Sequence, residues 1–176
     1  MAEWARSSLR PILLAIVSRL AEITEIASTR VILTVLPPDE VPPFGAPQDV
    51  LVRVRGEHPD EAAIDGTGRW HNLRHRSLDV ACRSRVSLDE AGRDYYRLTD
   101  ETLGHVLLED LVVEALELFN VPGDNDDLLT APLRVGRLTD PQRMKAPHHE
   151  WVFSVFSVDV TYVRDLDTEL TSQFDS

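Results

Sequence analysis

The sequence predicts a single α+β domain in which a mainly antiparallel sheet is flanked by two main helices and carries long loops. Three observations predict it. Two segments far apart in the chain have helical periodicity, several others alternate as strands do, and consecutive strands are joined without helical crossovers. With 176 residues the chain is long enough to bury one core. We expect residues 1–165 to form this domain and residues 166–176 to form a flexible acidic C-terminal tail.

The first helix is expected over residues 7–26, with Pro11 near its start where proline is tolerated. Its apolar residues recur at spacings of three and four and should form the buried stripe: Leu9, Leu13, Ile16, Val17, Leu20 and Ile23. Glu3, Arg19 and Glu22 distinguish this opening segment from a signal peptide. We therefore expect it to be an amphipathic helix of the mature protein.

A short β-branched strand is expected over residues 30–36, followed by a stiff loop with five prolines over residues 37–47. This loop is either a plain connector or an exposed arm that touches a neighbouring molecule through Val41 and Phe44. Residues 56–74 lack periodicity and hold three glycines, so a second long loop is expected there.

Two further strands surround that second loop. In residues 49–55, the valines at 50, 52 and 54 face one side, and Leu51, Arg53 and Arg55 face the other. Residues 75–86 alternate in the same way. We expect Leu78, Val80, Cys82 and Val86 to point inward, and Asp79, Ala81, Arg83 and Arg85 to point outward.

The second helix is expected over residues 99–119, ended by Asn120, Pro122 and Gly123. Its predicted buried stripe is Leu103, Val106, Leu107, Leu111, Ala115 and Leu118. Glu109, Glu114 and Glu117 lie largely opposite that stripe and should be exposed. A strand is expected over residues 133–138, although Gly136 weakens its pattern. Another is expected over residues 150–163, and the apolar residues of its first half suggest that both of its faces are covered there.

The charge pattern limits the classes of partner. The formal net charge is −12, and residues 100–127 hold nine acidic side chains and no lysine or arginine. Such a balance argues against binding a nucleic-acid backbone, which requires clustered basic residues. The acidic block is either a solvated face or a docking surface. No apolar run approaches the roughly 20 residues of a membrane span, so no membrane partner is expected.

The search for chemistry finds no catalytic motif. His71 and His75 are four residues apart, but they are flanked by arginines in a predicted loop and lack an acidic partner nearby, and His148 and His149 are merely adjacent. The aspartates of residues 124–127 lack the downstream glutamate of a calcium loop. Cys82, the single cysteine, excludes an internal disulfide, fits a cytoplasmic protein, and reads as a core residue. We therefore expect no catalytic residue, no metal site and no cofactor.

The order and text of these elements resemble the tail terminator, or tail completion (neck), proteins of tailed phages. The resemblance rests on the opening helix SSLRPILLAIVSRLAEI, the strand LDVACRSRV, the helix LLEDLVVEALELF and the final strands PLRVGRL and WVFSVFSVDVTYVRDLD, over about residues 8–165. It implies a structural virion protein of the tail or neck, assembled in the host cytoplasm. Its partners would be copies of itself in a six-membered ring, the tail tube protein and the head-side connector, without catalysis or a cofactor.

A head-to-tail ring needs two different, complementary patches on each subunit. We expect the subunit interface to use residues from the loops, the basic strands and the acidic helix: Phe44, Arg53, Arg55, Arg69, Arg83, Arg85, Glu109, Glu114 and Glu117. DNA would pass through the acidic ring without binding tightly. The alternatives are another head–tail connector, head-completion or baseplate assembly protein and, from a different class, a small α+β enzyme or ligand-binding domain.

Overall fold

The computed structural model shows an α+β domain built on one open sheet. It describes residues 9–23, 30–43, 47–59, 73–86, 98–100, 104–123 and 128–163. Its elements, in chain order, are α1 (Leu9–Ala21), β1 (Arg30–Thr34), β2 (Gln48–Pro59), β3 (Leu73–Arg85), α2 (His105–Leu116), β4 (Arg134–Leu138), β5 (Gln142–Arg143) and β6 (Trp151–Val163). The predicted C-terminal tail, Phe44, Arg69 and Leu103 lie outside the described residues.

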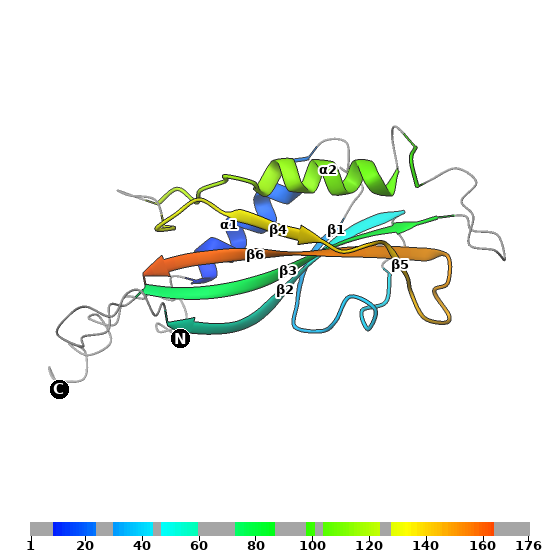
Figure 1. Ribbon diagram of the computed structural model, residues 1–176, viewed down its shortest axis with the longest axis horizontal. Coiled ribbons are helices and arrows are strands. Elements are labelled where there is room, and N and C mark those ends of the chain that lie inside the picture. Colours follow the sequence, from blue (N-terminus) through cyan, green and yellow to red (C-terminus); the bar gives the residue numbers. More distant parts are fainter. Residues whose placement is uncertain are drawn as a thin grey trace, which may run out of the picture.

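The sheet has the order β1-β2-β3-β6-β4, and β5 pairs with β6 beside β4. Every described pairing is antiparallel except that of β1 with β2. The predicted α+β class with a mainly antiparallel sheet is therefore confirmed. The three long strands β2, β3 and β6 run side by side through the centre, as Figure 1 shows.

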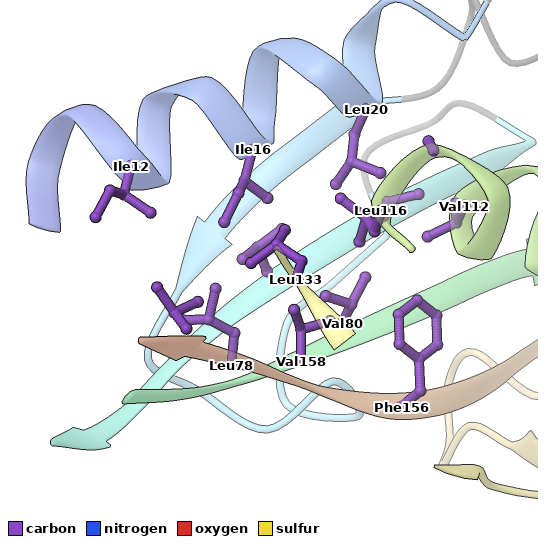
Figure 2. Close-up of a cluster of buried hydrophobic side chains, with 14 of the residues drawn as sticks. Ile12, Ile16, Leu20, Leu78, Val80, Val112, Leu116, Leu133, Phe156 and Val158 are labelled. Carbon is purple, nitrogen blue, oxygen red and sulfur yellow. The ribbon is translucent and has the colours of Figure 1, made fainter. Parts of the chain in front are cut away.

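Both helices pack on one face of this sheet and form the main core with it (Figures 1 and 2). The helices contribute Ile12, Ile16 and Leu20 from α1 and Leu108, Val112 and Leu116 from α2. The sheet contributes the residues that alternate inward on its central strands: Val50, Val52, Leu78, Val80, Cys82, Phe156, Val158 and Val160. The inward alternation of these strands is as predicted. Burial of each such side chain contributes about 1.5–3 kcal/mol.

The opposite face of the sheet is covered in part by two segments of the chain. The proline-rich segment after β1 brings Val41 onto Leu51 and Ala81. The connection between β5 and β6 brings Met144 onto Trp151 and Phe153. Both segments lie on the side of the sheet away from α2 in Figure 1. The first half of β6 is thus buried on both faces, as its sequence predicts.

The prediction for α2 was wrong about which face is buried. The buried residues are His105, Leu108, Glu109, Val112, Ala115 and Leu116, whereas Val106 and Leu118 are exposed and Leu107 and Leu111 are half-buried. Apolar residues occupy most of the helix circumference, so the period alone does not fix the buried arc. Contact with α1 as well as the sheet selects the observed arc. In α1, Ile12 is buried although the predicted stripe omitted it.

The ends of α2 are set by backbone contacts that the sequence does not show. The N–H of Gly104, the N-cap residue, donates to Asp100 O at 2.9 Å, and a Cβ at Gly104 would lie 2.3 Å from that oxygen. At the other end Leu118 adopts a φ of 62°, and its N–H donates to Leu133 O at 3.0 Å. The helix therefore ends before the predicted stop at Asn120.

The strands also differ from the predicted ranges. β2 and β3 extend into the segment predicted as a loop over residues 56–74, with a register shift between Val54 and Glu57. β5 was not predicted, because its two residues have no alternation of their own. Gly136 lies at a second register shift, where a Cβ would come within 2.4 Å of Ser157 Oγ. The glycine that weakened the strand pattern thus packs closely against the exposed hydroxyl of Ser157, which a Cβ would displace.

The corrected helix face gives a stability prediction. Leu116→Ala should lower the free energy of unfolding by about 2–5 kcal/mol, because Leu116 is fully buried and its truncation leaves a cavity. The control Val106→Ala, on the exposed side of α2, should change it by less than about 0.5 kcal/mol. Urea unfolding followed by circular dichroism measures both. Equal losses in the two variants would contradict the assigned face.

Candidate subunit interface

The structure brings Arg53 and Arg55 together on the uncovered part of the outer face, around one carboxylate. Arg53 Nη1 lies 3.5 Å from Asp79 Oδ2, and Arg55 Nη1 lies 3.5 Å from Asp79 Oδ1. Arg53 Nε also donates to Val35 O at 3.3 Å, at the end of β1. Two guanidinium groups share one carboxylate, so this surface retains a local excess of positive charge. Exposed pairs of this kind contribute little to stability.

Arg83, predicted to point outward at the interface, is instead fully buried. Its Nε and Nη2 donate to the two oxygens of Asp49, each at 2.6 Å. Its Nη1 donates to Pro38 O at 2.9 Å and to Val41 O. The strand alternation was predicted correctly, but the proline-rich segment folds over this side of the sheet and encloses it. Arg83 thus holds that segment in place and is not available to a neighbouring molecule.

Burial and the neighbouring Arg83 have opposite effects on the pKa of the Asp49 carboxyl. Burial raises the pKa of the Asp49 carboxyl, while the hydrogen bonds and charge of Arg83 act to lower it. Two charges of opposite sign and a planar, bidentate geometry allow the pair to remain in the interior. Arg85, two residues further along β3, is exposed, as predicted.

The three glutamates proposed for the acidic patch lie in three different environments. Glu114 is exposed, as predicted. Glu117 is half-buried: its Oε2 accepts the N–H of Val135 at 2.7 Å, and its Oε1 lies 3.5 Å from Arg134 Nη1. Glu109 is buried against the sheet, so the prediction that it is exposed was wrong. The exposed acidic residues of α2 are Asp110 and Glu114.

Glu109 ends a chain of buried hydrogen bonds between α2 and the sheet. Gln48 Nε2 donates to Ser84 Oγ at 3.3 Å, and Ser84 Oγ lies 2.9 Å from His105 Nδ1. His105 Nε2 lies 2.9 Å from Ser154 Oγ, and Ser154 Oγ donates to Glu109 Oε1. Both serines and His105 have no exposed surface.

His105 contacts the sheet through both ring nitrogens. The Ser154 hydroxyl donates to the Glu109 carboxylate and Ser84 accepts from Gln48, so each serine joins His105 to a second polar side chain. His105 Nε2 also lies 3.2 Å from Glu109 Oε1, one turn further along α2. Buried polar groups that bond to one another in this way avoid the cost of burial without a partner. His105 was not among the residues predicted from the sequence. Its local signal is a spacing of four residues from Glu109, and its serine partners come from the distant strands β3 and β6.

Burial acts to raise the pKa of the Glu109 carboxyl, but hydrogen bonds from His105 and Ser154 and the proximity of His105 outweigh it. The pKa of Glu109 therefore lies below its ordinary value. Burial also raises the pKa of the Cys82 thiol, and the Cys82 side chain lies in the core as predicted.

Within the described ranges, no group of three or more His, Cys, Asp or Glu side chains is arranged to hold a metal ion. Neither described helix is long and apolar enough to cross a membrane. His71 and residues 124–127, considered above as metal ligands, lie outside these ranges.

Comparison with known proteins identifies the fold. No family model matches the chain, and no curated protein matches it. Among solved structures, a chain of the "Virion of native gene transfer agent (GTA) particle" superimposes with a TM-score of 0.51. The alignment covers 85% of this chain and 92% of that chain, at 14% sequence identity. The two chains share a fold over nearly their whole lengths.

The burial of Arg83 gives a second prediction. Arg83→Ala should lower the free energy of unfolding by about 3–5 kcal/mol, because it leaves the Asp49 carboxylate buried without a partner. Arg85→Ala, on the same strand but exposed, is the control and should have little effect. Chemical denaturation measures both. A double variant, Asp49→Leu with Arg83→Met, should recover much of the loss, whereas no recovery would contradict a pairwise cause.

Glu109 gives a prediction about pH. Its lowered pKa means that the charged form stabilises the fold above the pKa of an unfolded-chain glutamate, about 4.3. That contribution is lost as the pH falls through the lower pKa of the folded state. Glu109→Gln should therefore cost about 1–3 kcal/mol at pH 7. The difference from the parent should shrink below pH 4, and the exposed control Glu114→Gln should show no such trend. A pH-independent difference would contradict the charge-based cause.

Proposed function

We propose that this protein is a structural component of a phage-type virion. The observation that carries the proposal is the fold shared with a chain of a gene transfer agent virion particle, along 85% of this chain. We further propose that it acts as a ring-forming tail terminator, which caps the tail tube and joins it to the head-side connector. The order of helix, strands, helix and strands supports this role, because it is the order on which the resemblance to that family rests.

The proposed partners follow from that role. They are further copies of the chain in a ring of six, the tail tube protein and the head-side connector protein. The proposed location is the tail or neck of the virion, with assembly in the host cytoplasm. The proposal includes neither a catalytic reaction nor a cofactor. Another connector, head-completion or baseplate role would use the same class of fold and differs only in the partners.

Two surfaces of unlike charge support a head-to-tail arrangement of copies. Arg53 and Arg55 surround Asp79 on the outer face of the sheet. Asp110 and Glu114 are exposed on α2, which packs on the other face. Unlike patches on opposite sides of one subunit suit heterologous contacts, which close into a ring when the rotation permits.

The enzymatic alternative has one observation in its favour, the grouping of serine, histidine and glutamate at the base of α2. Such a grouping can activate a serine hydroxyl in hydrolases. Here Ser84, Ser154 and His105 are fully buried and their donors and acceptors satisfy one another. In this conformation no substrate reaches them. The grouping is therefore best explained as the attachment of α2 to the sheet.

The role as a ring subunit predicts a charge-reversal result. Arg55→Glu and Glu114→Lys should each prevent ring formation, because each places like charges at the contact. Mixing the two single variants should restore ring formation, because an alternating ring pairs the reversed residues at one contact and the parent residues at the next. Arg143→Glu, an exposed change on β5, is the control. Negative-stain imaging with purified tail tubes and light scattering measure the result, with circular dichroism as the folding check. Normal rings from Arg55→Glu would remove the arginine pair from the interface.

The same role predicts weak DNA binding. With a net charge of −12 per chain, the isolated protein should not bind duplex DNA measurably at physiological salt. Fluorescence anisotropy with labelled duplex tests this, with a basic DNA-binding protein as the positive control. Sub-micromolar binding that weakens steeply with salt would instead indicate a DNA-handling protein.

A further inference from the structure

β1 leaves one edge of the sheet open. Within the described chain it pairs with β2 alone and stands at the end of the strand order. The sequence of residues 31–36, VILTVL, holds no charge, proline or glycine. Leu33, Val35 and Leu36 are 40%, 73% and 47% exposed. An uncharged, apolar edge strand is a template for pairing with another strand, and monomeric proteins usually protect such an edge.

The opposite edge of the sheet is protected against the addition of a further strand. β4 carries a register shift at Gly136, and its Arg134 and Arg137 are exposed. Irregular pairing and charged side chains both discourage the addition of a strand. Residues 31–36, by contrast, carry no charged side chain, and the pairing of β1 with β2 has no register shift. The two edges are thus treated differently, and β1 is the one suited to accept a partner.

The chain itself supplies a segment with matching chemistry. β6 ends at Val163, and thirteen residues follow it. In residues 165–175 the sequence alternates with a period of two. One side carries Leu166, Thr168, Leu170, Ser172 and Phe174, and the other carries Asp165, Asp167, Glu169, Thr171, Gln173 and Asp175. This is the pattern of a strand with one apolar and one acidic side.

Both sides of such a strand find a complement at the β1 edge. Leu33 shares the helix-side face with Val31, which packs against the main core, so the apolar side of an added strand would extend that surface. On the other face, Arg53 donates to Val35 O and shares Asp79 with Arg55. This basic pair is placed to meet the acidic side.

We propose that the C-terminal segment, residues 165–175, of one copy adds as a strand to the β1 edge of a neighbouring copy. The inference rests on the proposed function in one respect, that copies of the chain associate. It names the contact by which they do so: main-chain pairing supplies the affinity, and the alternating side chains set the register.

Geometry favours the neighbouring copy over the same chain. Val163 pairs with Leu73 at the far end of the sheet, whereas β1 reaches only as far as Arg53 on β2. An added strand beyond β1 lies four strand spacings across and about seven residues along from Val163, which amount to roughly 30 Å, or about nine extended residues. Within one chain, Leu166 and Leu170 would both lie in the stretch that crosses from β6 to the β1 edge, so neither could pair with β1. Only a neighbour can receive the whole alternating segment.

Disulfide trapping tests the proposal with full-length chains. One chain carries Val35→Cys and the other carries Leu170→Cys. The native Cys82 is fully buried and does not compete. Mild oxidation of the mixture should give a disulfide-linked dimer. Arg143→Cys replaces Val35→Cys as the control, because Arg143 is exposed on β5 at the other sheet edge, and should give at least tenfold less. A double variant with both cysteines in one chain, oxidised at high dilution, should remain unlinked.

Each other outcome overturns the proposal. A link that forms within the dilute double variant places the segment on its own chain. Failure of the mixture to link more than the control removes the segment from the β1 edge. Imaging on tail tubes separates this result from the proposed function. Rings that form without the disulfide-linked dimer would support the terminator role and contradict the strand pairing. A disulfide-linked dimer without rings would support the strand pairing and contradict the terminator role. As a second measurement, Val35→Lys should weaken self-association at least tenfold in sedimentation.

Discussion

The pairing of β3 with both of its neighbours constrains the rest of the molecule. β3 is matched residue by residue with β6 from Leu73 to Arg85 and with β2 from Leu78 to Ser84, and its pairing with β2 continues past one register shift to Arg74. Because side chains alternate along a strand, this register assigns Leu78, Val80 and Cys82 to the helices and Asp79, Ala81 and Arg83 to the other face. A slip of one residue would exchange the two sets. The two helices, the covering segments and the buried ion pair all presuppose this register.

Arginine side chains at the two ends of the outer face differ in burial and in the number of their partners. Where the proline-rich segment covers the sheet, Arg83 is enclosed and is matched by a carboxylate and two backbone carbonyl oxygens. Where no described segment covers it, Arg53 and Arg55 share Asp79 loosely and remain accessible to partners. Lys145 and Asp39, 2.9 Å apart, connect the two covering segments. The buried arginine and the two more exposed arginines thus come from neighbouring strands, β3 and β2.

The sequence allowed the strands to be predicted better than the surfaces. The strand over residues 150–163 has an apolar first half and an alternating later half, so its own sequence suffices to locate it. Arg83 and Glu109 were misplaced because their burial depends on partners distant in the chain, Asp49 and Ser154. The spacing of residues within one segment does not predict that a distant loop covers a strand, or that serines from other strands bond to a histidine of a helix. β5 is too short to have a period, and its pairing depends on β6.

The position of β6 has a mechanical consequence. β6 lies between β3 and β4 and leads directly into the last residues of the chain. A pull on that end is directed along the strand, so the perpendicular hydrogen bonds to β3 bear the load together and do not open one at a time. Tension applied at the C-terminus would therefore enter the sheet through its longest continuous ladder and be shared across the full length of the domain.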